Sequence, residues 1–347
     1  MGFIFFNLLK AILMKKAKGI FLFSGGLDSL LGAKLLLDQG VELIGFHLIL
    51  PFYDPGLDPK KLLATKLAGE INLPLVYYWC GQEYLEMVKS PKHGYGKNLN
   101  PCVDCRIYFL QKAFKLMQQK KADFVATGEV VGQRPMSQLK NTLNHITKES
   151  NLKGILLRPL SAKNLEPTLV EEKGLVEREK LLGFSGRSRK QQLDLAKTLG
   201  ISNFSSPSGG CFFTDPNIAK VIKDLFSYHP NFKPLDFFLL MQGRNFRLSE
   251  EAKVLISRNE KDGEALFKYK EEADYFFLPH FKGPVAWLKG KINDDKIDLV
   301  ASLILKYSKK GFDSDKCQID LLEKGVFKRT ILVTEVISDK ELEKIRI

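Results

Sequence analysis

The sequence lacks an uninterrupted hydrophobic run that could cross a bilayer. The apolar stretch of residues 1–14 is too short for a membrane span, and Lys10 interrupts it. No charged segment precedes this stretch, as one would in a secretory signal peptide. Low-complexity tracts and internal repeats are absent as well. We therefore expect a cytoplasmic protein that does not associate with membranes, and leave open whether translation starts at Met1 or at Met14.

Cysteine is scarce. There are 5 cysteines, and an odd number excludes complete internal disulfide pairing. In a reducing compartment, grouped cysteines more often serve a metal or catalysis. Cys102 and Cys105 form a Cys-x-x-Cys motif, and Cys211 follows a Gly-Gly pair. We expect these thiols on turns, with the first two flanking the start of a helix near Arg106. The helix end and this arginine would lower the pKa of the two thiols.

Four arrangements of these cysteines remain open at this stage. The leading hypothesis is a [4Fe–4S] cluster on Cys102, Cys105 and Cys211, because three thiolates leave one iron free for substrate or sulfide. The second is a metal-free pair in which Cys102 and Cys211 carry sulfur as a persulfide and resolve it as a disulfide. The third is a zinc site with His93 as a further ligand. In the fourth, all the cysteines are small buried hydrophobic residues.

A glycine-rich loop lies between two apolar runs and lacks the GK[ST] ending of a P-loop. It reads Ser24-Gly25-Gly26-Leu27-Asp28-Ser29, and its context predicts a strand, a turn and a helix. Glycine lets the backbone approach an anion, and the helix N-terminus offers N–H groups and a positive dipole end. The loop is therefore expected to hold phosphate. Asp28 is expected either to hold a metal ion or to cap the helix.

The distribution of apolar runs predicts an α/β protein with a doubly wound parallel sheet and a second, smaller α+β domain. Ligands of such sheets bind at the carboxyl ends of the strands, where Ser24, Thr127 and Gly128 would lie. We expect domain boundaries at residues 1–216, 217–240 for a connecting helix and linker, and 241–347. The predicted strands of the first domain are residues 19–23, 41–50, 73–79, 123–127 and 155–157.

The charge balance favours a polyanionic partner. The net charge is +13, and nucleic acid is the first candidate. Residues 187–190 either grip the phosphates of tRNA or ATP, or form a solvated first helical turn. The candidate RNA contacts are Arg134, Arg187, Arg189, Lys190, Arg244, Arg247 and Arg258.

The order of these motifs resembles that of the tRNA thiouridylases, which belong to the ATP pyrophosphatase (PP-loop) superfamily. The resemblance is carried by the SGGLDS loop, by Asn100-Pro101-Cys102, by Thr127-Gly128 and by the Gly-Gly-Cys context of Cys211. Residues 128–133 and 137–138 are more similar to the 4-thiouridine synthase branch. The second domain resembles the RNA-binding module of NFACT proteins in residues 243–248, 257–260 and 274–277.

The resemblance implies an adenine nucleotide alpha-hydrolase-like fold and ATP-dependent thiolation of a tRNA uridine. It also implies Mg²⁺, a sulfur donor (sulfide or a persulfide carrier protein) and a catalytic role for Asp28, Cys102 and Cys211; a homodimer is left open. The residues implied in ATP binding are Ser24, Gly25, Gly26, Asp28, Ser29, Thr127 and Gly128. The alternatives are a persulfide-based thiouridylase, a PP-loop enzyme acting on a small molecule, and a non-catalytic RNA-binding protein.

Overall fold

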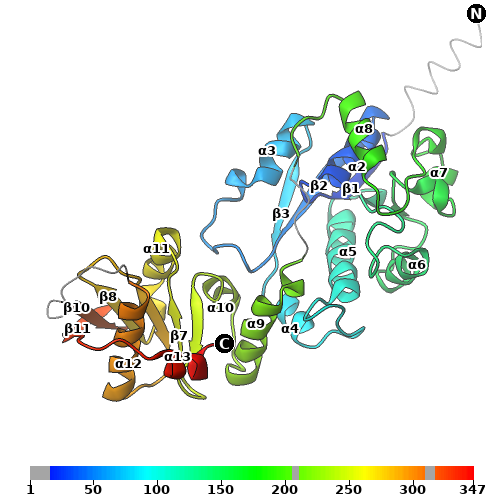
Figure 1. Ribbon diagram of the computed structural model, residues 1–347. Coiled ribbons are helices and arrows are strands. Elements are labelled where there is room, and N and C mark those ends of the chain that lie inside the picture. Colours follow the sequence, from blue (N-terminus) through cyan, green and yellow to red (C-terminus); the bar gives the residue numbers. More distant parts are fainter. Residues whose placement is uncertain (1–15, 205–210, 309–316) are drawn as a thin grey trace, which may run out of the picture. The chain divides into compact units, whose positions relative to one another are not determined.

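The computed structural model describes residues 16–204, 211–308 and 317–347. They form two compact units (Figure 1). The first contains the described residues of Met1–Leu50 and Gly56–Cys211, and the second contains Pro51–Pro55 together with the described residues of Phe212–Ile347. Within the described ranges, no helix is both long enough and apolar enough to cross a membrane.

The first unit is built on a five-stranded sheet in the order β3-β2-β1-β4-β5. All of its strand pairs are parallel. The chain builds outward from β1 to β3 and then returns to place β4 on the other side of β1, so β1 and β4 flank the point where the strand order reverses. The strands are β1 (Lys18–Leu22), β2 (Glu42–Ile49), β3 (Leu75–Trp79), β4 (Phe124–Thr127) and β5 (Leu156–Leu157).

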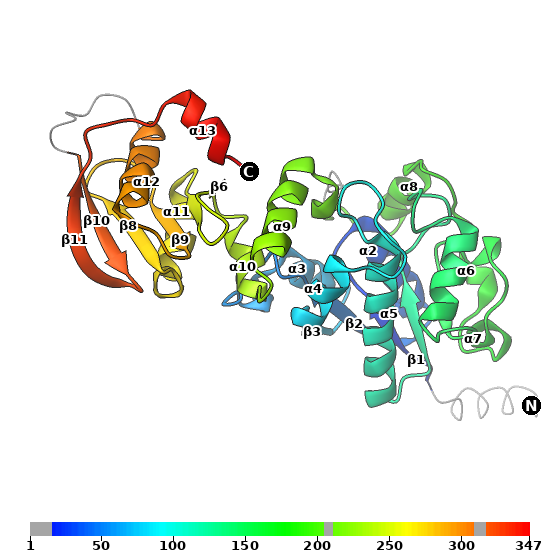
Figure 2. The ribbon, with the colours of Figure 1, turned by 90° about the horizontal axis from the view of Figure 1, so that it is seen from below.

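Helices cover both faces of this sheet (Figures 1 and 2). Side chains alternate along a strand, so Phe21 packs on one face with α2 (Leu27–Asp38) and α3 (Leu63–Glu70). Its neighbour Ile20 packs on the other face with α5 (Cys102–Gln119) and α6 (Lys140–Glu149). The predicted doubly wound parallel sheet is confirmed. The remaining α-helices of the unit are α4 (Gln82–Lys89), α7 (Leu169–Glu172) and α8 (Lys190–Thr198).

The second unit is a six-stranded antiparallel sheet in the order β11-β10-β8-β9-β7-β6. On one face pack α12 (Asp294–Lys306) and α13 (Asp339–Ile345), and on the other α10 (Pro234–Leu239) and α11 (Glu260–Lys268). The helix α9 (Pro216–Tyr228) precedes them. This is the expected separate α+β fold. Its strands are β6 (Arg244–Arg247), β7 (Lys253–Ile256), β8 (Tyr275–Pro279), β9 (Ala286–Lys289), β10 (Gln318–Glu323) and β11 (Val326–Leu332).

A short segment from the first half of the sequence belongs to the second unit. Pro51–Pro55 is assigned there by its contacts. The Phe52 ring lies 5.2 Å from the Phe213 ring and 6.0 Å from the Phe237 ring, measured between centroids. Asp54 accepts a hydrogen bond of 2.8 Å from Lys268 Nζ. The loop after β2 is therefore part of the second unit's structure.

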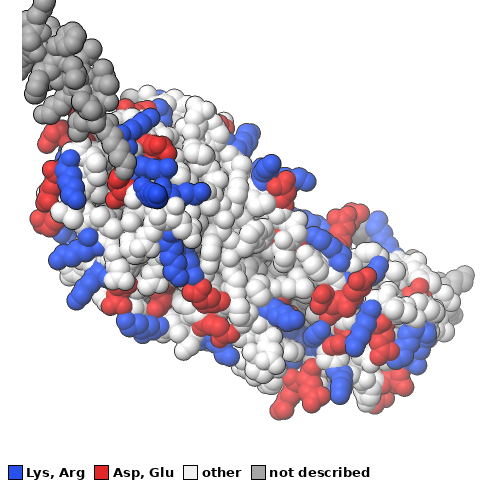
Figure 3. Space-filling model, turned by 180° about the vertical axis from the view of Figure 1, so that it is seen from behind, with Lys and Arg blue, Asp and Glu red and all other residues white. Residues whose placement is uncertain are grey.

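The surface shows no simple division of charge. On the face shown in Figure 3, Lys and Arg side chains are interspersed with Asp and Glu side chains. The net charge of +13 is thus not gathered into one continuous basic patch on this face. The contacts that each basic side chain makes within the protein therefore determine whether it is available to bind a polyanion.

Candidate nucleotide and cysteine site

The glycine-rich loop connects β1 to α2 in a geometry that only glycine allows at one position. Gly25 has a φ of 78°, and a Cβ there would lie 2.9 Å from Ala64 Cα. Ser29 Oγ donates a hydrogen bond of 2.8 Å to the Gly26 carbonyl oxygen, and Ser24 Oγ lies 3.2 Å from Ser29 Oγ. In the first turn of α2, Ser29 N donates a hydrogen bond of 3.0 Å to the Gly26 carbonyl oxygen, and the N–H groups before it have no intrahelical acceptor. The loop therefore offers backbone donors and serine hydroxyls to an anion.

Asp28 lies in the first turn of α2, and its N-cap residue is Gly26. Gln133 Nε2 donates a hydrogen bond of 2.8 Å to Asp28 Oδ2, whereas the buried Asp28 Oδ1 accepts no hydrogen bond from the described residues. Burial raises the pKa of Asp28, against the opposing effects of the Gln133 hydrogen bond and the charges of Arg189 and Arg134. Asp28 thus presents one unsatisfied acceptor at the phosphate loop and does not act as the helix cap.

The end of β4 touches the phosphate loop. A Cβ on Gly128 would lie 2.4 Å from the Asp28 carbonyl oxygen and 2.7 Å from the Ser29 nitrogen. The next residue, Glu129, is almost completely buried. Glycine at 128 therefore permits the close packing of the strand end on the loop that the sequence analysis placed near the nucleotide.

Glu129 connects the end of β4 with α5, the helix that carries the Cys-x-x-Cys motif. Arg158 Nε lies 3.0 Å from Glu129 Oε2, and Arg106 Nε, from α5, lies 3.5 Å from Glu129 Oε1. Thr127 Oγ1 donates a hydrogen bond of 3.1 Å to Glu129 Oε2. Burial raises the pKa of Glu129, but the two guanidinium groups outweigh burial, and the pKa lies below its ordinary value. A buried carboxylate therefore fixes Arg106 beside the nucleotide loop.

The helix that carries the Cys-x-x-Cys motif starts earlier than predicted. Pro101 is the N-cap residue of α5, and Cys102 is its first residue. Both Cys102 and Cys105 therefore lie within the first turn, where the expectation of a start near Arg106 had placed them outside the helix. Proline is common at helix starts because it has no N–H to satisfy.

The three motif cysteines lie close together. A negative charge on Cys102 or Cys211 would raise the pKa of Cys105, and one on Cys211 would also raise the pKa of Tyr84. The buried Tyr84 hydroxyl lies 3.5 Å from Cys105 Sγ. Burial raises the pKa of the Cys105 thiol to about 12 and outweighs the opposite effect of Arg106, so the predicted lowering is wrong for this thiol. A bound metal or cluster would be needed to keep Cys105 as a thiolate.

A fourth cysteine, which the sequence analysis left apart, belongs to the same neighbourhood. Cys80 is a buried residue just after β3, and burial raises the pKa of its thiol to about 12. A negative charge on Cys105 would raise this pKa further. Its position after an apolar strand was a usable signal, because carboxyl ends of parallel strands meet at one edge of the sheet. Cys317, by contrast, lies in the core of the second unit.

The described residues show no ready-made site for a single metal ion. Across the described residues, no group of three His, Cys, Asp or Glu side chains surrounds a point that could hold one ion. The proposed zinc ligand His93 is engaged elsewhere: its Nδ1 lies 2.9 Å from Asp104 Oδ1 and its Nε2 3.0 Å from His145 Nε2. Both ring nitrogens of His93 are thus engaged by other side chains, and a cluster on the three motif cysteines remains a prediction.

The basic residues predicted to contact RNA fall into two groups in the first unit. The charges of Arg134 and Arg189 reach Asp28, and the buried Arg189 Nε donates no hydrogen bond to the described residues. Arg187 and Lys190 are exposed at the start of α8. The first pair lies beside the phosphate loop, and the second faces solvent.

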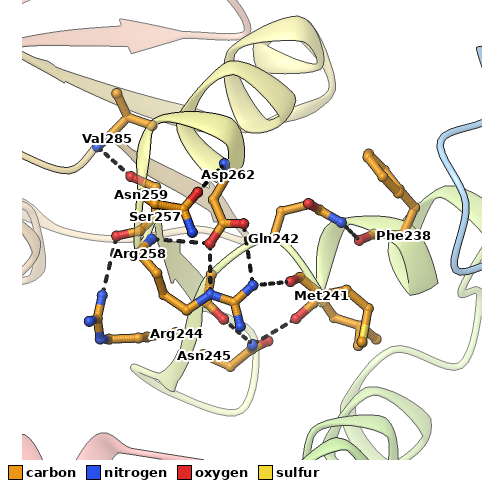
Figure 4. A network of polar contacts seen from close by, with 12 residues as sticks. Phe238, Met241, Gln242, Arg244, Asn245, Ser257, Arg258, Asn259, Asp262 and Val285 are labelled. Carbon is orange, nitrogen blue, oxygen red and sulfur yellow. Dashed lines mark hydrogen bonds and ion pairs between the residues drawn. The ribbon is translucent and has the colours of Figure 1, made fainter. Parts of the chain in front are cut away.

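In the second unit, the three predicted arginines make internal contacts. Arg258 Nε lies 2.7 Å from Asp262 Oδ2, and Arg244 donates a hydrogen bond of 3.3 Å to the Ser257 carbonyl oxygen (Figure 4). Arg247 Nη2 lies 2.6 Å from Asp224 Oδ2. Only Arg258 is exposed. An RNA contact by any of them remains a prediction.

Several known proteins resemble this chain. The tRNA-specific 2-thiouridylase MnmA of Leptospira interrogans serogroup Icterohaemorrhagiae serovar copenhageni (strain Fiocruz L1-130) is 26% identical over 248 residues, which cover 67% of this chain and 61% of that protein. The chain thus spans about three fifths of the length of this relative. Two solved structures align with TM-scores of 0.33. One is a predicted subunit of a tRNA methyltransferase from Methanocaldococcus jannaschii, at 15% identity over 52% of this chain and 76% of that chain. The other is a 4-thiouridine synthetase in complex with RNA and bound ATP, at 20% identity over 53% of this chain and 52% of that chain.

Two family models match separate parts of the chain. Residues 14–167 match the family described as thiamine biosynthesis protein (ThiI). Residues 243–346 match the NFACT protein RNA binding domain. The resemblances expected from the motifs are confirmed: one part of the chain is similar to ThiI and another to the NFACT RNA-binding domain.

Proposed function

We propose that this protein is an ATP-dependent tRNA sulfurtransferase that converts a uridine to a thiouridine. The observation that carries the proposal is the proximity of two reactive elements. The phosphate loop and the Cys-x-x-Cys helix lie at the same end of the sheet, and Glu129 connects them through Arg106. The match of residues 14–167 to the ThiI family and the tRNA-modifying relative support the same reaction class.

The nucleotide half of the site is suited to activating a carbonyl oxygen. A uridine carbonyl oxygen is a poor leaving group, so AMP is first transferred to it and pyrophosphate departs. The loop N–H groups and Ser24 and Ser29 would hold the pyrophosphate. Asp28 Oδ1, which accepts no hydrogen bond from the described residues, would hold Mg²⁺ directly or through water. Arg189 lies near enough to Asp28 to neutralise phosphate charge.

The cysteine half of the site would supply sulfur. A sulfur nucleophile attacks C2 or C4 of the adenylated uridine, and AMP leaves with the original oxygen. Cys102, Cys105 and Cys211 would hold a [4Fe–4S] cluster, which when bound leaves one iron open to sulfide. Cys105 is partly buried, and its Sγ lies 3.5 Å from the Tyr84 hydroxyl, within hydrogen-bond distance. The alternative is a persulfide on Cys102 or Cys211, with the other thiol as the resolving group.

The second unit would hold the RNA. Residues 243–346 match an RNA-binding family, and a net charge of +13 favours a polyanion. The target base must leave its stack to reach the first unit, as in other enzymes that act on bases. The sulfur donor would be sulfide or a persulfide carrier protein, and a homodimer is compatible with the proposal.

The first experiment is purification of the full chain without oxygen, followed by a visible spectrum and analysis of iron and sulfide. A broad band near about 400 nm that is lost in Cys102→Ala, Cys105→Ala and Cys211→Ala would support the cluster. Cys317→Ala is the matched control, because Cys317 lies in the core of the second unit. A colourless protein without iron after reconstitution would rule out the cluster and leave the persulfide pair.

The second experiment is the reaction itself. The chain is incubated with unmodified tRNA, ATP, Mg²⁺ and sulfide, and the nucleosides are analysed for thiouridine. Stoichiometric AMP and thiouridine are the expected products. AMP release that does not depend on tRNA would point to a small-molecule substrate, and the absence of ATP binding would point to a non-catalytic RNA-binding protein.

A further inference from the structure

The second unit contains a cavity of about 290 Å³. It is lined by α9, α10 and the segment between them, and by β7, β9 and the end of the turn before β8. Its volume corresponds to about ten water molecules, and a single nucleobase has a similar number of non-hydrogen atoms. Most of the lining precedes residue 243, where the match to the RNA-binding family begins. The cavity is therefore a feature that the family match does not account for.

One wall of the cavity contains a buried lysine. Lys253 lines the cavity, is buried, and places Nζ 3.2 Å from Asp224 Oδ2. The Asp224 carboxylate also pairs with Arg247. Arg247 Nε lies 3.0 Å from Asp224 Oδ1, and Arg247 Nη2 lies 2.6 Å from Asp224 Oδ2. The Asp224 carboxylate thus pairs with two cations, and the carboxylate of Asp236 also acts on Lys253. Burial lowers the pKa of Lys253 to about 8 despite the attraction of Asp224. The amine would gain from a ligand acceptor atom or anion in the cavity.

Another wall contains two aromatic side chains, Trp287 at 5% exposure and Tyr228 at 43%. Trp287 lines the cavity, and its ring orientation is fixed because Nε1 donates a hydrogen bond of 2.9 Å to the Tyr269 carbonyl oxygen. Tyr228 is exposed and also lines the cavity, and the Arg247 guanidinium lies 4.5 Å from the centroid of its ring. Leucine side chains complete the apolar part. Aromatic surfaces of this kind stack with unpaired bases, and their stacking tolerates different base identities.

Polar groups also border the cavity. Lys289 Nζ donates a hydrogen bond of 2.8 Å to the Glu272 carbonyl oxygen and remains 44% exposed, so it can reorient toward a ligand. Asp236 accepts a hydrogen bond of 2.6 Å from the Lys233 nitrogen, and it adds an acceptor to the lining. A nucleotide presents the complementary chemistry, with a flat ring, edge donors and acceptors, and a phosphate.

We propose that this cavity binds one unstacked nucleotide, with its base against Trp287 and its acceptor atoms or phosphate toward Lys253 and Lys289. The inference rests on the proposed function for the source of the nucleotide, which is an RNA strand held by the second unit. A free mononucleotide shares the same chemistry and is distinguished by the experiment. The site holds RNA at a point separate from the uridine that reacts in the first unit.

The test uses fluorescence of the full chain. The sequence has 2 tryptophans, so Trp79→Phe leaves Trp287 as the sole emitter. Oligouridylate and uridine monophosphate are titrated separately, and quenching of Trp287 gives each Kd. Lys289→Met in this background is expected to raise the Kd about tenfold. Lys328→Met is the matched control, because Lys328 is a lysine of the same unit with 46% exposure and does not line the cavity. Thermal unfolding verifies that both variants are folded.

The outcomes separate this inference from the proposed function. Quenching by oligouridylate that Lys289→Met weakens and Lys328→Met preserves supports the site with RNA as the source. Equally tight quenching by uridine monophosphate supports the site with a free nucleotide as the source. If neither ligand changes Trp287 emission while the chain still binds and thiolates tRNA, the inference is overturned and the proposed function stands. Quenching without any thiolation would contradict the proposed function alone.

Discussion

Single residues decide whether the nucleotide half of the site can form. A Cβ at position 128 would press on backbone atoms of Asp28 and Ser29, which cannot move without shifting the phosphate loop. We expect Gly128→Ala to destabilise the first unit by about 1–3 kcal/mol and to reduce AMP formation at least about tenfold. Gly69→Ala is the control, because a Cβ there meets nothing within 4 Å. Pyrophosphate release and thermal unfolding measure both effects, and unchanged ATP use in Gly128→Ala would refute the close packing as a requirement.

Site residues that belong to short motifs could be predicted from the sequence. Those whose roles depend on contacts between distant segments could not. Asp28 and Gly128 stand in short patterns with known chemistry. Glu129 and Gln133 were seen only as part of a family resemblance, because their roles come from contacts with Arg158 and Asp28, far away in the sequence. Cys80 was not grouped with the motif cysteines, because only the fold brings it near Cys105.

Glu129 gives a second prediction at the residue scale. Glu129→Gln leaves the buried Arg158 and the half-buried Arg106 without their carboxylate, and we expect a loss of about 3–5 kcal/mol at pH 7. The folded pKa of Glu129 lies below the ordinary 4.5, so its contribution is present above that pH and is lost as pH falls through the folded pKa. The difference between wild type and variant should therefore shrink in acid. Glu179→Gln, at an exposed position, is the control, and chemical denaturation at several pH values tests the trend.

At the scale of elements, periodic apolar runs predicted the sheet of the first unit well, and irregular connections were harder. All five predicted strands of that unit overlap the observed ones. In the second unit, β10 (Gln318–Glu323) carries a weak strand signal, because polar and apolar residues alternate only from Gln318 to Leu321. The start of α5 was placed too late because Pro101 was interpreted as a turn residue, whereas it is the helix N-cap. Pro51–Pro55 belongs to the second unit because of contacts with residues distant in the sequence, which no local sequence pattern predicts.

The attachment of α9 to the second sheet depends on one carboxylate. Asp224 on α9 pairs with Arg247 on β6 and Lys253 on β7, and all three side chains are largely buried. We expect Asp224→Asn to destabilise the second unit by about 3–5 kcal/mol, because two cations lose their partner. Urea unfolding in the Trp79→Phe background, followed by Trp287 emission, measures the loss, with Asp298→Asn on the exposed face of α12 as the control. Equal unfolding midpoints for the two variants would show that this pairing does not stabilise the unit.

At the scale of the whole molecule, net charge and the resemblance to RNA-modifying families pointed to a polyanionic partner, but charge alone could not say which basic residues meet it. Arg244 and Arg247 turned out to be engaged inside the second unit. Arg189 lies beside Asp28, and only two positions away Arg187 is exposed. Within residues 187–190, one arginine thus lies near Asp28 and the other is exposed to solvent, a difference that the basic motif itself does not indicate.

The different surroundings of Arg187 and Arg189 predict different effects when each is replaced. Arg187→Gln should weaken tRNA binding and reduce the slope of log K against log salt concentration by about one, because one phosphate contact is lost. Arg189→Gln should leave that slope unchanged and raise the KM for ATP about tenfold, because its side chain lies near Asp28 at the phosphate loop. Filter binding at several salt concentrations and steady-state AMP formation measure the two quantities, and each variant serves as the control for the other. If Arg189→Gln lowered the salt slope without changing the KM for ATP, both arginines would belong to the tRNA surface and the phosphate loop would have to hold ATP without Arg189.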